Sequence, residues 1–123
     1  MSCMLLVDTS GWIEHFHHGF PPLALALGQS QVMLHPAIIG ELATGNLKDR
    51  DTTLAALRRL PLSQEGTFAE CLHFLDMHQL YGKGIGWSDI QILVSASLSR
   101  VLVWTHDKRL ARAAGQRGLL YIP

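Results

Sequence analysis

The chain has 123 residues, of which 48% are hydrophobic and 16% are charged, a composition typical of one globular domain with its own apolar core. Ten basic residues balance ten acidic ones, so net charge alone does not draw the chain to nucleic acid. No apolar run approaches the roughly 18 residues of a membrane-spanning helix, which argues against a membrane protein. We therefore expect a single domain over residues 1–123.

The N-terminus and the cysteines both predict a cytoplasmic protein. The first residues lack a basic segment followed by an apolar stretch and a small-residue cleavage site, which is the pattern of a signal peptide. Cys3 and Cys71 lie far apart and have no metal-ligand spacing, so we expect reduced thiols.

Apolar runs and helical periodicity alternate along the chain. The apolar runs predict short strands over residues 4–7, 31–34, 60–62, 101–104 and 119–122. Apolar spacing and boundary residues predict helices over residues 11–18, 23–27, 36–44, 52–59, 67–79, 89–99 and 108–115. This alternation is typical of a parallel sheet covered by helices on both faces. In such sheets ligands bind beyond the carboxyl ends of the strands, so the residues after each strand are the first candidates for a site.

Two helices carry apolar stripes that we expect to face the core. The expected inward side chains are Trp12, Ile13 and Phe16 in the first helix, and Phe68, Leu72, Leu75 and Leu80 in or just after the helix over 67–79. We assign the three tryptophans, Trp12, Trp87 and Trp104, to the core rather than to base stacking.

The stretch over residues 80–98 joins a glycine-rich loop to an apolar helix. The loop has glycine at every second position from Gly82 to Gly86, which lets the backbone approach a ligand closely. It is not a GxGxxG motif and follows a helix, which argues against a dinucleotide site. Ser88 and Gln91 have the spacing of a capping box, which would leave Asp89 free in the first turn of the helix.

Two further aspartates follow predicted strands. Asp8 comes directly after the first strand, and Asp107 comes shortly after the strand over 101–104. Each could instead cap the helix that begins beside it, since Asp is a favoured capping residue. For Asp107 both interpretations stay open, whereas Thr9 or Ser10 could cap in place of Asp8.

Glu41 stands among apolar and small residues in HPAIIGELATG, with no charged residue three or four positions away. Because a buried, unpaired carboxylate is costly, we expect Glu41 to face a cation from outside its own helix. Asp8, Glu41, Asp89 and Asp107 gathered in one pocket would repel one another unless a cation lay between them. Oxygen-only ligation suits Mg²⁺ or Mn²⁺, so the sequence predicts a divalent-metal site of the kind that supports attack on phosphorus.

These carboxylates lie in blocks that resemble those of PIN-domain ribonucleases. The blocks are LLVDTSGWIEH, HPAIIGELATGNLKDR, LYGKGIGWSDIQILVSASL and VWTHDKRLARAA. Their order and spacing are most similar to VapC toxins of bacterial type II toxin–antitoxin systems. The resemblance implies a three-layer α/β/α fold and a Mg²⁺- or Mn²⁺-dependent endoribonuclease, typically acting on tRNA or rRNA. It assigns metal binding and catalysis to Asp8, Glu41, Asp89 and Asp107, with Ser10 and Thr105 in supporting positions.

The resemblance also implies partners: a VapB-like antitoxin, operator DNA bound only through that antitoxin, and a second copy of the chain in a homodimer. The RNA substrate would need basic contacts, and from residue 77 onward only Asp89 and Asp107 oppose six bases, namely Lys83, Arg100, Lys108, Arg109, Arg112 and Arg117. We select Lys83, Lys108, Arg109 and Arg112 as candidates for phosphate contacts, against the simpler interpretation that each is solvated surface.

Two other functions are weighed against the nuclease. A non-catalytic regulator would bind an antitoxin and co-regulate its own operon, but such a scaffold would not need the complete set of carboxylates. A phosphoacceptor receiver domain would need paired acids after the first strand, where Leu6 and Val7 precede a lone Asp8.

The histidines are weaker candidates for a site. His15, His17 and His18 are not spaced to share one helix face, so we expect a surface patch rather than zinc ligands. His106, next to Asp107, could contact phosphate, although a lone histidine is more commonly structural.

Overall fold

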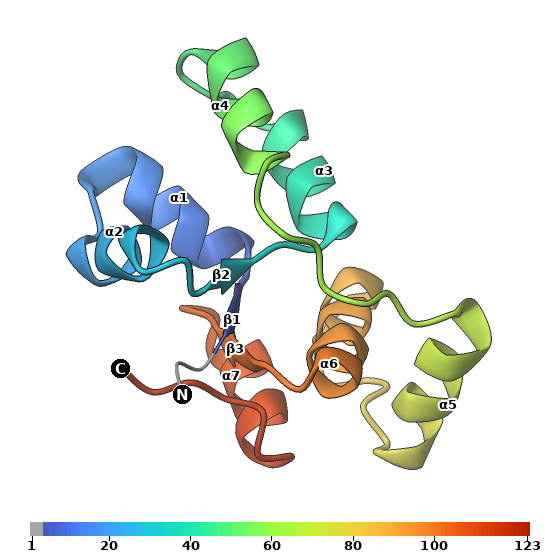
Figure 1. Ribbon diagram of the computed structural model, residues 1–123. Coiled ribbons are helices and arrows are strands. Elements are labelled where there is room, and N and C mark those ends of the chain that lie inside the picture. Colours follow the sequence, from blue (N-terminus) through green and yellow to red (C-terminus); the bar gives the residue numbers. More distant parts are fainter. Residues whose placement is uncertain (1–3) are drawn as a thin grey trace.

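The computed structural model describes residues 4–123, so Cys3 lies outside the described residues. In chain order the elements are β1 (Leu5–Val7), α1 (Thr9–His18), α2 (Pro21–Gly28), β2 (Val32–Met33), α3 (Pro36–Thr44), α4 (Arg50–Leu57), α5 (Phe68–Met77), α6 (Trp87–Ser99), β3 (Leu102–Trp104) and α7 (Lys108–Gly115) (Figure 1). The strands expected over 60–62 and 119–122 are reduced to single parallel bridges, Leu34 with Leu62 and Val103 with Leu120.

The sheet has the strand order β2–β1–β3, and both pairings are parallel. The bridge at Leu62 adds one residue at one edge, and Pro61 has no N–H with which to lengthen it. Val7, the last residue of β1, pairs with Trp104, the last residue of β3. The residues that follow these two strands are therefore neighbours in space.

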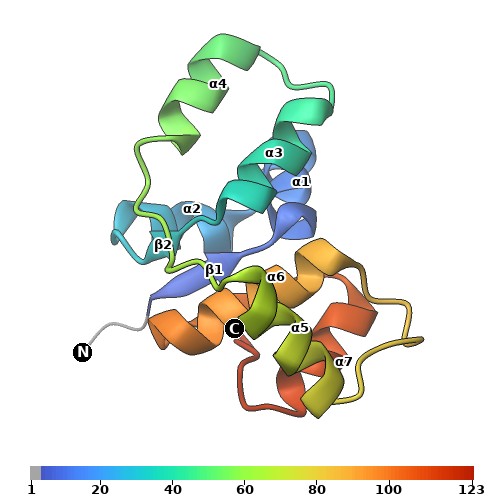
Figure 2. The ribbon, with the colours of Figure 1, turned by 90° about the vertical axis from the view of Figure 1, so that its right-hand side faces the viewer.

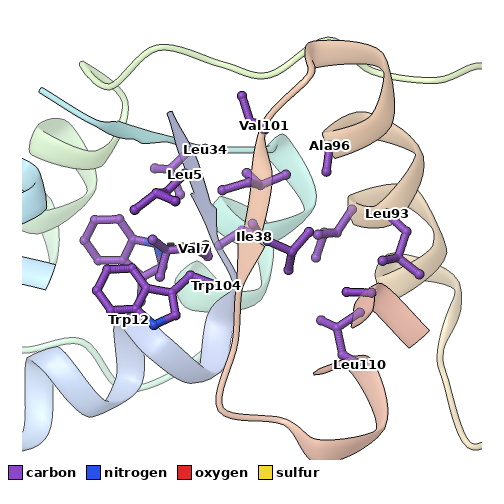
Figure 3. Close-up of a cluster of buried hydrophobic side chains, with 14 of the residues drawn as sticks. Leu5, Val7, Trp12, Leu34, Ile38, Leu93, Ala96, Val101, Trp104 and Leu110 are labelled. Atoms are coloured by element: carbon purple, nitrogen blue, oxygen red, sulfur yellow. Dashed lines mark hydrogen bonds between the residues drawn. The ribbon is translucent and has the colours of Figure 1, made fainter. Parts of the chain in front are cut away.

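Helices cover both faces of the sheet. Figure 2 shows α1–α4 on one side of β1 and α5–α7 on the other. β1 is buried over its whole length, as expected for a central parallel strand. Side chains from β1, α3, α6 and α7 meet in one apolar cluster that includes Val7, Ile38, Leu93 and Leu110 (Figure 3). This is the three-layer α/β/α arrangement expected from the sequence.

Helix α6 is deeply buried and packs against β3 and α5. Its buried polar residue, Ser95, donates a hydrogen bond to the carbonyl of Gln64 (2.5 Å), which satisfies the hydroxyl inside the core. The helix has 13 residues, and no helix in residues 4–123 is both long and apolar enough to cross a bilayer.

The inward face expected for α5 is right for Leu75, which packs against the core, and for Leu80 just after the helix, which is buried, but wrong for Phe68 and Leu72. Phe68 is 71% exposed and Leu72 is also exposed, whereas Cys71 is buried. Phe74 and Leu75 pack against the core, three and four residues after Cys71. The buried stripe is therefore displaced around the helix from the predicted one, because packing against α6 selects among the apolar residues.

The apolar stripe expected for α1 is also only partly buried. Trp12 is buried, but Ile13 is 43% exposed and Phe16 is 37% exposed. Among the tryptophans, Trp12 and Trp104 lie in the core as expected, whereas Trp87 is 39% exposed. Trp87 begins α6 at the surface, where its ring packs on that of Phe68 with centroids 5.3 Å apart.

Candidate active site

Asp8 lies directly beyond β1 and is buried. Its Oδ1 accepts hydrogen bonds from the Ser10 hydroxyl (2.6 Å) and from the Gly11 N–H (3.2 Å), so Asp8 itself is the N-cap of α1. Its Oδ2 accepts a hydrogen bond from the Thr105 hydroxyl (2.6 Å). Both oxygens are thus held in place, by donors from two distant parts of the chain.

Ser10 and Thr105 join the loop after β1 to the loop after β3. The Ser10 hydroxyl accepts a hydrogen bond from the His106 N–H (2.9 Å), and the Thr105 hydroxyl accepts one from the Asp107 N–H (2.9 Å). The two hydroxyl oxygens lie 3.3 Å apart. Each hydroxyl therefore donates to Asp8 and accepts from the second loop, which aligns the two loops.

Asp107 caps α7, which confirms one of the two roles that the sequence left open for this residue. Its Oδ1 accepts hydrogen bonds from the N–H groups of Arg109 (2.9 Å) and Leu110 (3.0 Å). Its side chain is exposed, and its Oδ2 has no hydrogen-bond partner among residues 4–123. Capping therefore leaves one oxygen free for a ligand.

Asp89 does take part in capping, contrary to the prediction that Ser88 and Gln91 would cap α6. The helix begins at Trp87, so Gly86 is the N-cap and Asp89 is the third helical residue. Oδ2 of Asp89 accepts a hydrogen bond from the Gly86 N–H (3.2 Å). Glycine has no side chain to complete a reciprocal capping box. The helix begins two residues earlier than predicted.

The glycine loop makes that turn with two residues in the left-handed region. Gly82 has φ +69° and Gly84 has φ +76°, conformations that glycine adopts without strain. Gly82 and Gly84 therefore adopt conformations that other residues rarely take, while the close approach of a ligand to this loop stays a prediction.

The charges of the other three carboxylates act on Asp89. Burial raises the pKa of the Asp89 carboxyl above its ordinary value, and the charges of Asp107, Asp8 and Glu41 raise it further. The hydrogen bond from the Gly86 N–H lowers the pKa of Asp89. The four predicted carboxylates, from four separate segments, therefore lie within electrostatic reach at the carboxyl edge of the sheet.

Glu41 lies near the other three carboxylates, but the prediction that its side chain is buried is wrong. Its side chain is exposed on α3 rather than buried among apolar neighbours, so it does not need a cationic partner for its own stability. Apolar sequence neighbours did not predict burial because α3 turns only part of its surface, including Ile38 and Leu42, toward the core.

The donor set fits a hard divalent cation in chemistry, since every candidate ligand is a carboxylate oxygen. Within residues 4–123, no three His, Cys, Asp or Glu side chains are arranged as a ready-made metal site. Asp89 nevertheless feels three like charges, and it keeps Oδ1 free of hydrogen bonds within residues 4–123. A cation among them would relieve this repulsion.

The candidate phosphate contacts do not all gather in one place. Lys83, Arg109 and Arg112 line one cavity, together with Arg117, which sequence reasoning had counted among the bases but not selected. Lys108 is exposed and does not line that cavity. The sequence holds one signal for this arrangement, the helical spacing of Arg109, Arg112 and Gln116, which places their side chains on one face of α7.

The histidines occupy structural or surface positions. Nδ1 of His15 accepts a hydrogen bond from the Phe20 N–H (3.3 Å), while His17 and His18 are exposed at the end of α1. The ring of His106 packs edge-on against that of Phe20, with centroids 4.9 Å apart.

The chain is similar to known proteins in sequence and in fold. No family model matches the chain. Ribonuclease VapC32, in two strains of Mycobacterium tuberculosis, is 38% identical over 117 residues, covering 94% of this chain and 94% of the relative. The crystal structure of PAE2754 from Pyrobaculum aerophilum matches with a TM-score of 0.60 at 15% identity, covering 91% of this chain and 86% of that chain, which supports the fold alone. Identity at this level over nearly the whole length shows that the chain belongs to the family of VapC-type PIN-domain ribonucleases.

Proposed function

We propose that this chain is a divalent-metal-dependent endoribonuclease toxin that cleaves cellular RNA in the cytoplasm, with tRNA or rRNA as its substrate class. The observation that most supports the proposal is the arrangement of the loops after β1 and β3, where Thr105 joins Asp8 to the backbone of Asp107. Asp89 lies close enough that the charges of Asp107, Asp8 and Glu41 add to the rise in its pKa caused by burial. Four carboxylates in electrostatic contact favour a cation between them. The name of the VapC32 relatives, ribonuclease, agrees with this chemistry.

Asp8, Glu41, Asp89 and Asp107 would hold Mg²⁺ or Mn²⁺. When bound, such a cation supplies a Lewis acid that neutralises charge on a scissile phosphate and activates water for in-line attack. The chain's own contribution is preorganisation. Ser10 and Thr105 hold both oxygens of Asp8, so this carboxylate is oriented before RNA arrives.

The test is cleavage of total cellular RNA by purified protein with Mg²⁺ or Mn²⁺, followed by mapping of the new RNA ends. Asp89→Asn keeps an oxygen that can accept the Gly86 N–H but removes the charge, and it should abolish specific ends. Asp76→Asn makes the same change on the exposed surface of α5 and should cleave like the wild type. Identical end profiles from Asp89→Asn and the wild type, or cleavage that persists in a chelator, would refute the proposal.

A VapB-type antitoxin is the second partner that we propose, and it would bind operator DNA on behalf of the complex. Two cavities of about 280 and 390 Å³ lie along α1, where it faces α3 and α4, and Phe16 lines both. With Ile13 also exposed, the surface offers apolar anchors for an amphipathic helix. Glu41 lines the smaller cavity, so an occupant there would lie beside the carboxylates and obstruct RNA.

Substitution at this surface separates neutralisation from cleavage. Ile13→Asp should prevent neutralisation by the product of the adjacent reading frame while RNA cleavage continues. Leu25→Asp is the control, because Leu25 is exposed on α2 and lines neither cavity. Unchanged neutralisation of Ile13→Asp would exclude this surface.

A homodimer is the third element of the proposal. Phe68, Leu72 and Met77 are exposed along α5, and Trp87 lies against Phe68. Burying these side chains against a second copy would remove an apolar patch from water. Sedimentation should give a dimer for the wild type and a monomer for Leu72→Asp, and a monomeric wild type would refute this element.

A further inference from the structure

A cavity of about 330 Å³ lies between α7 and the chain that leads from α5 to α6. Four cationic side chains line it: Lys83, Arg109, Arg112 and Arg117. No Asp or Glu is among the residues that line it. The cavity therefore has the charge of an anion-binding site.

The local structure shapes this cavity. Arg109 and Arg112 are three residues apart on α7, and Ala113 and Gln116 continue the same helical face. A Cβ on Gly84 would lie 2.6 Å from Nη1 of Arg109, so the glycine loop runs close against the guanidinium, which would have to shift to admit a larger residue. The left-handed φ of Gly84, +76°, brings the loop to this position.

The positive charge of the cavity is not neutralised within residues 4–123. The guanidinium of Arg117 donates to two neutral carbonyls, Nη1 to Ala113 (2.8 Å) and Nη2 to His78 (3.2 Å). Its Nε is buried and has no hydrogen-bond partner in the described residues. Burial lowers the pKa of His78, and the neighbouring charge of Arg117 lowers it further, which is the response of an imidazole to a positive field. Such a cluster gains stability from a bound anion.

The cavity adjoins the carboxylates through two connections. Asp107 caps α7, and Arg112 follows it by five residues, a rise of roughly 8 Å along the helix. On the opposite wall, Lys83 and Ile85 lead directly to Gly86 and the start of α6, which carries Asp89. A strand of RNA held at the carboxylates would therefore have a neighbouring phosphate within reach of the cavity.

We propose that this cavity binds a backbone phosphate of the RNA substrate beside the cleaved bond, through Arg109, Arg112, Arg117 and Lys83. The inference rests on the proposed ribonuclease function and adds the part of the surface that positions the substrate. Arg112 and Lys83 are positioning residues, because they would hold the strand and would not touch the reacting phosphorus.

The experiment measures binding without cleavage. A fluorescently labelled single-stranded RNA of twelve uridines is titrated with protein in EDTA at several salt concentrations. Each phosphate contact on a single strand contributes about 0.7 to the slope of log affinity against log salt. Because three cations would remain around the same phosphate, Arg112→Gln should lower that slope by up to about 0.7 and weaken binding by up to about fivefold at about 0.1 M salt. Lys83→Gln, in the exposed loop, should act in the same direction with little risk to folding.

The control is Arg59→Gln, which removes an exposed arginine just after α4 and should leave both affinity and slope unchanged. Wild-type affinity and slope for both Arg112→Gln and Lys83→Gln would overturn the inference, as would failure of the wild type to bind the RNA. If the cavity binds only free phosphate, inorganic phosphate should stabilise the wild type thermally and Arg112→Gln should remove this effect without changing RNA binding. That result also overturns the inference. The assay needs no catalysis, so it tests this inference separately from the proposed function. If the wild type cleaves RNA but both variants bind RNA as the wild type does, this inference fails and the proposed ribonuclease function stands.

Discussion

The hydroxyl of Thr105 donates a hydrogen bond of 2.6 Å to Oδ2 of Asp8, a residue 97 positions earlier in the chain. The same hydroxyl accepts the backbone N–H of Asp107 (2.9 Å), so one side chain connects the Asp8 carboxylate to the backbone of Asp107. The parallel pairing of β1 with β3 makes this contact possible, since it brings the ends of both strands together. Thr105 therefore holds Asp8 by a hydrogen bond, and its supporting role in catalysis stays a prediction.

Removing the Thr105 hydroxyl should weaken both the fold and the site. Thr105→Val has nearly the same shape but leaves Oδ2 of Asp8 and the Asp107 N–H each without this partner. We expect the free energy of unfolding to fall by about 1–2 kcal/mol, measured by urea denaturation, and RNA cleavage to fall with it. Thr105→Ser, which keeps the hydroxyl, should retain most of both. Equal stability of the Val and Ser variants would contradict the proposed support.

Neutralising Asp89 should stabilise the protein while it removes activity. The pKa of Asp89 in the folded chain is raised by burial and by Asp107, Asp8 and Glu41, so the folded state binds its proton more readily than the unfolded state. Stability is therefore lost as the pH rises from about 4 through the folded pKa, and the loss persists at neutral pH. Asp89→Asn should raise the Tm by a few degrees at pH 7 and by less near pH 4. Asp76→Asn, at an exposed position on α5, should leave the Tm unchanged. A Tm of Asp89→Asn below that of the wild type at pH 7 would contradict the repulsion between the carboxylates.

Divalent cations should stabilise the wild type through the same carboxylates. A cation that binds only the folded chain adds about 2.7 kcal/mol at one hundred times its dissociation constant. We expect Mn²⁺ or Mg²⁺ to raise the Tm of the wild type, with a much smaller effect on Asp89→Asn. Sodium chloride at matched ionic strength controls for simple screening of the carboxylates. Equal stabilisation by sodium chloride and by the divalent salts would argue against a metal site.

His35 should make stability depend on pH in the mildly acidic range. It is buried at the N-cap of α3, where its Nδ1 accepts the Ala37 N–H (2.9 Å). Burial lowers its pKa, and the charge of Glu65 opposes this shift only in part. Since the folded chain binds this proton less readily than the unfolded chain, stability should fall as the pH drops through about 6.5 toward the folded pKa.

The matching variant is His35→Asn, which keeps an acceptor suited to capping but does not titrate. Thermal melts between pH 7 and pH 5 should show a shallower loss of stability for His35→Asn than for the wild type. His17→Asn, at an exposed position on α1, should follow the wild type. The same pH dependence in all three proteins would mean that His35 is not the titrating group.

The parts of the fold that could be predicted are those in which residues close together in the sequence all indicate the same element. The apolar runs at β1 and β3 and the residues after them indicated a parallel sheet with Asp8 and Asp107 at its carboxyl edge, because strand ends are visible locally. The inward face of α5 could be predicted only in part: Leu75 and Leu80 face the core as expected, but contact with α6 buries Cys71 instead of Phe68. The apolar sequence neighbours of Glu41 predict its burial, yet burial depends on which face of α3 meets the core.

By itself, the sequence determined the α/β alternation, the four carboxylates and the blocks that mark a VapC-type ribonuclease, since these depend on residue types and their order along the chain. Only the tertiary structure decided that Asp89 helps to cap α6 and also feels three other carboxylates, and that Arg117 completes a basic cavity with Lys83. The physical reason is distance: electrostatic interaction and burial depend on separation in space, which the order of residues does not specify.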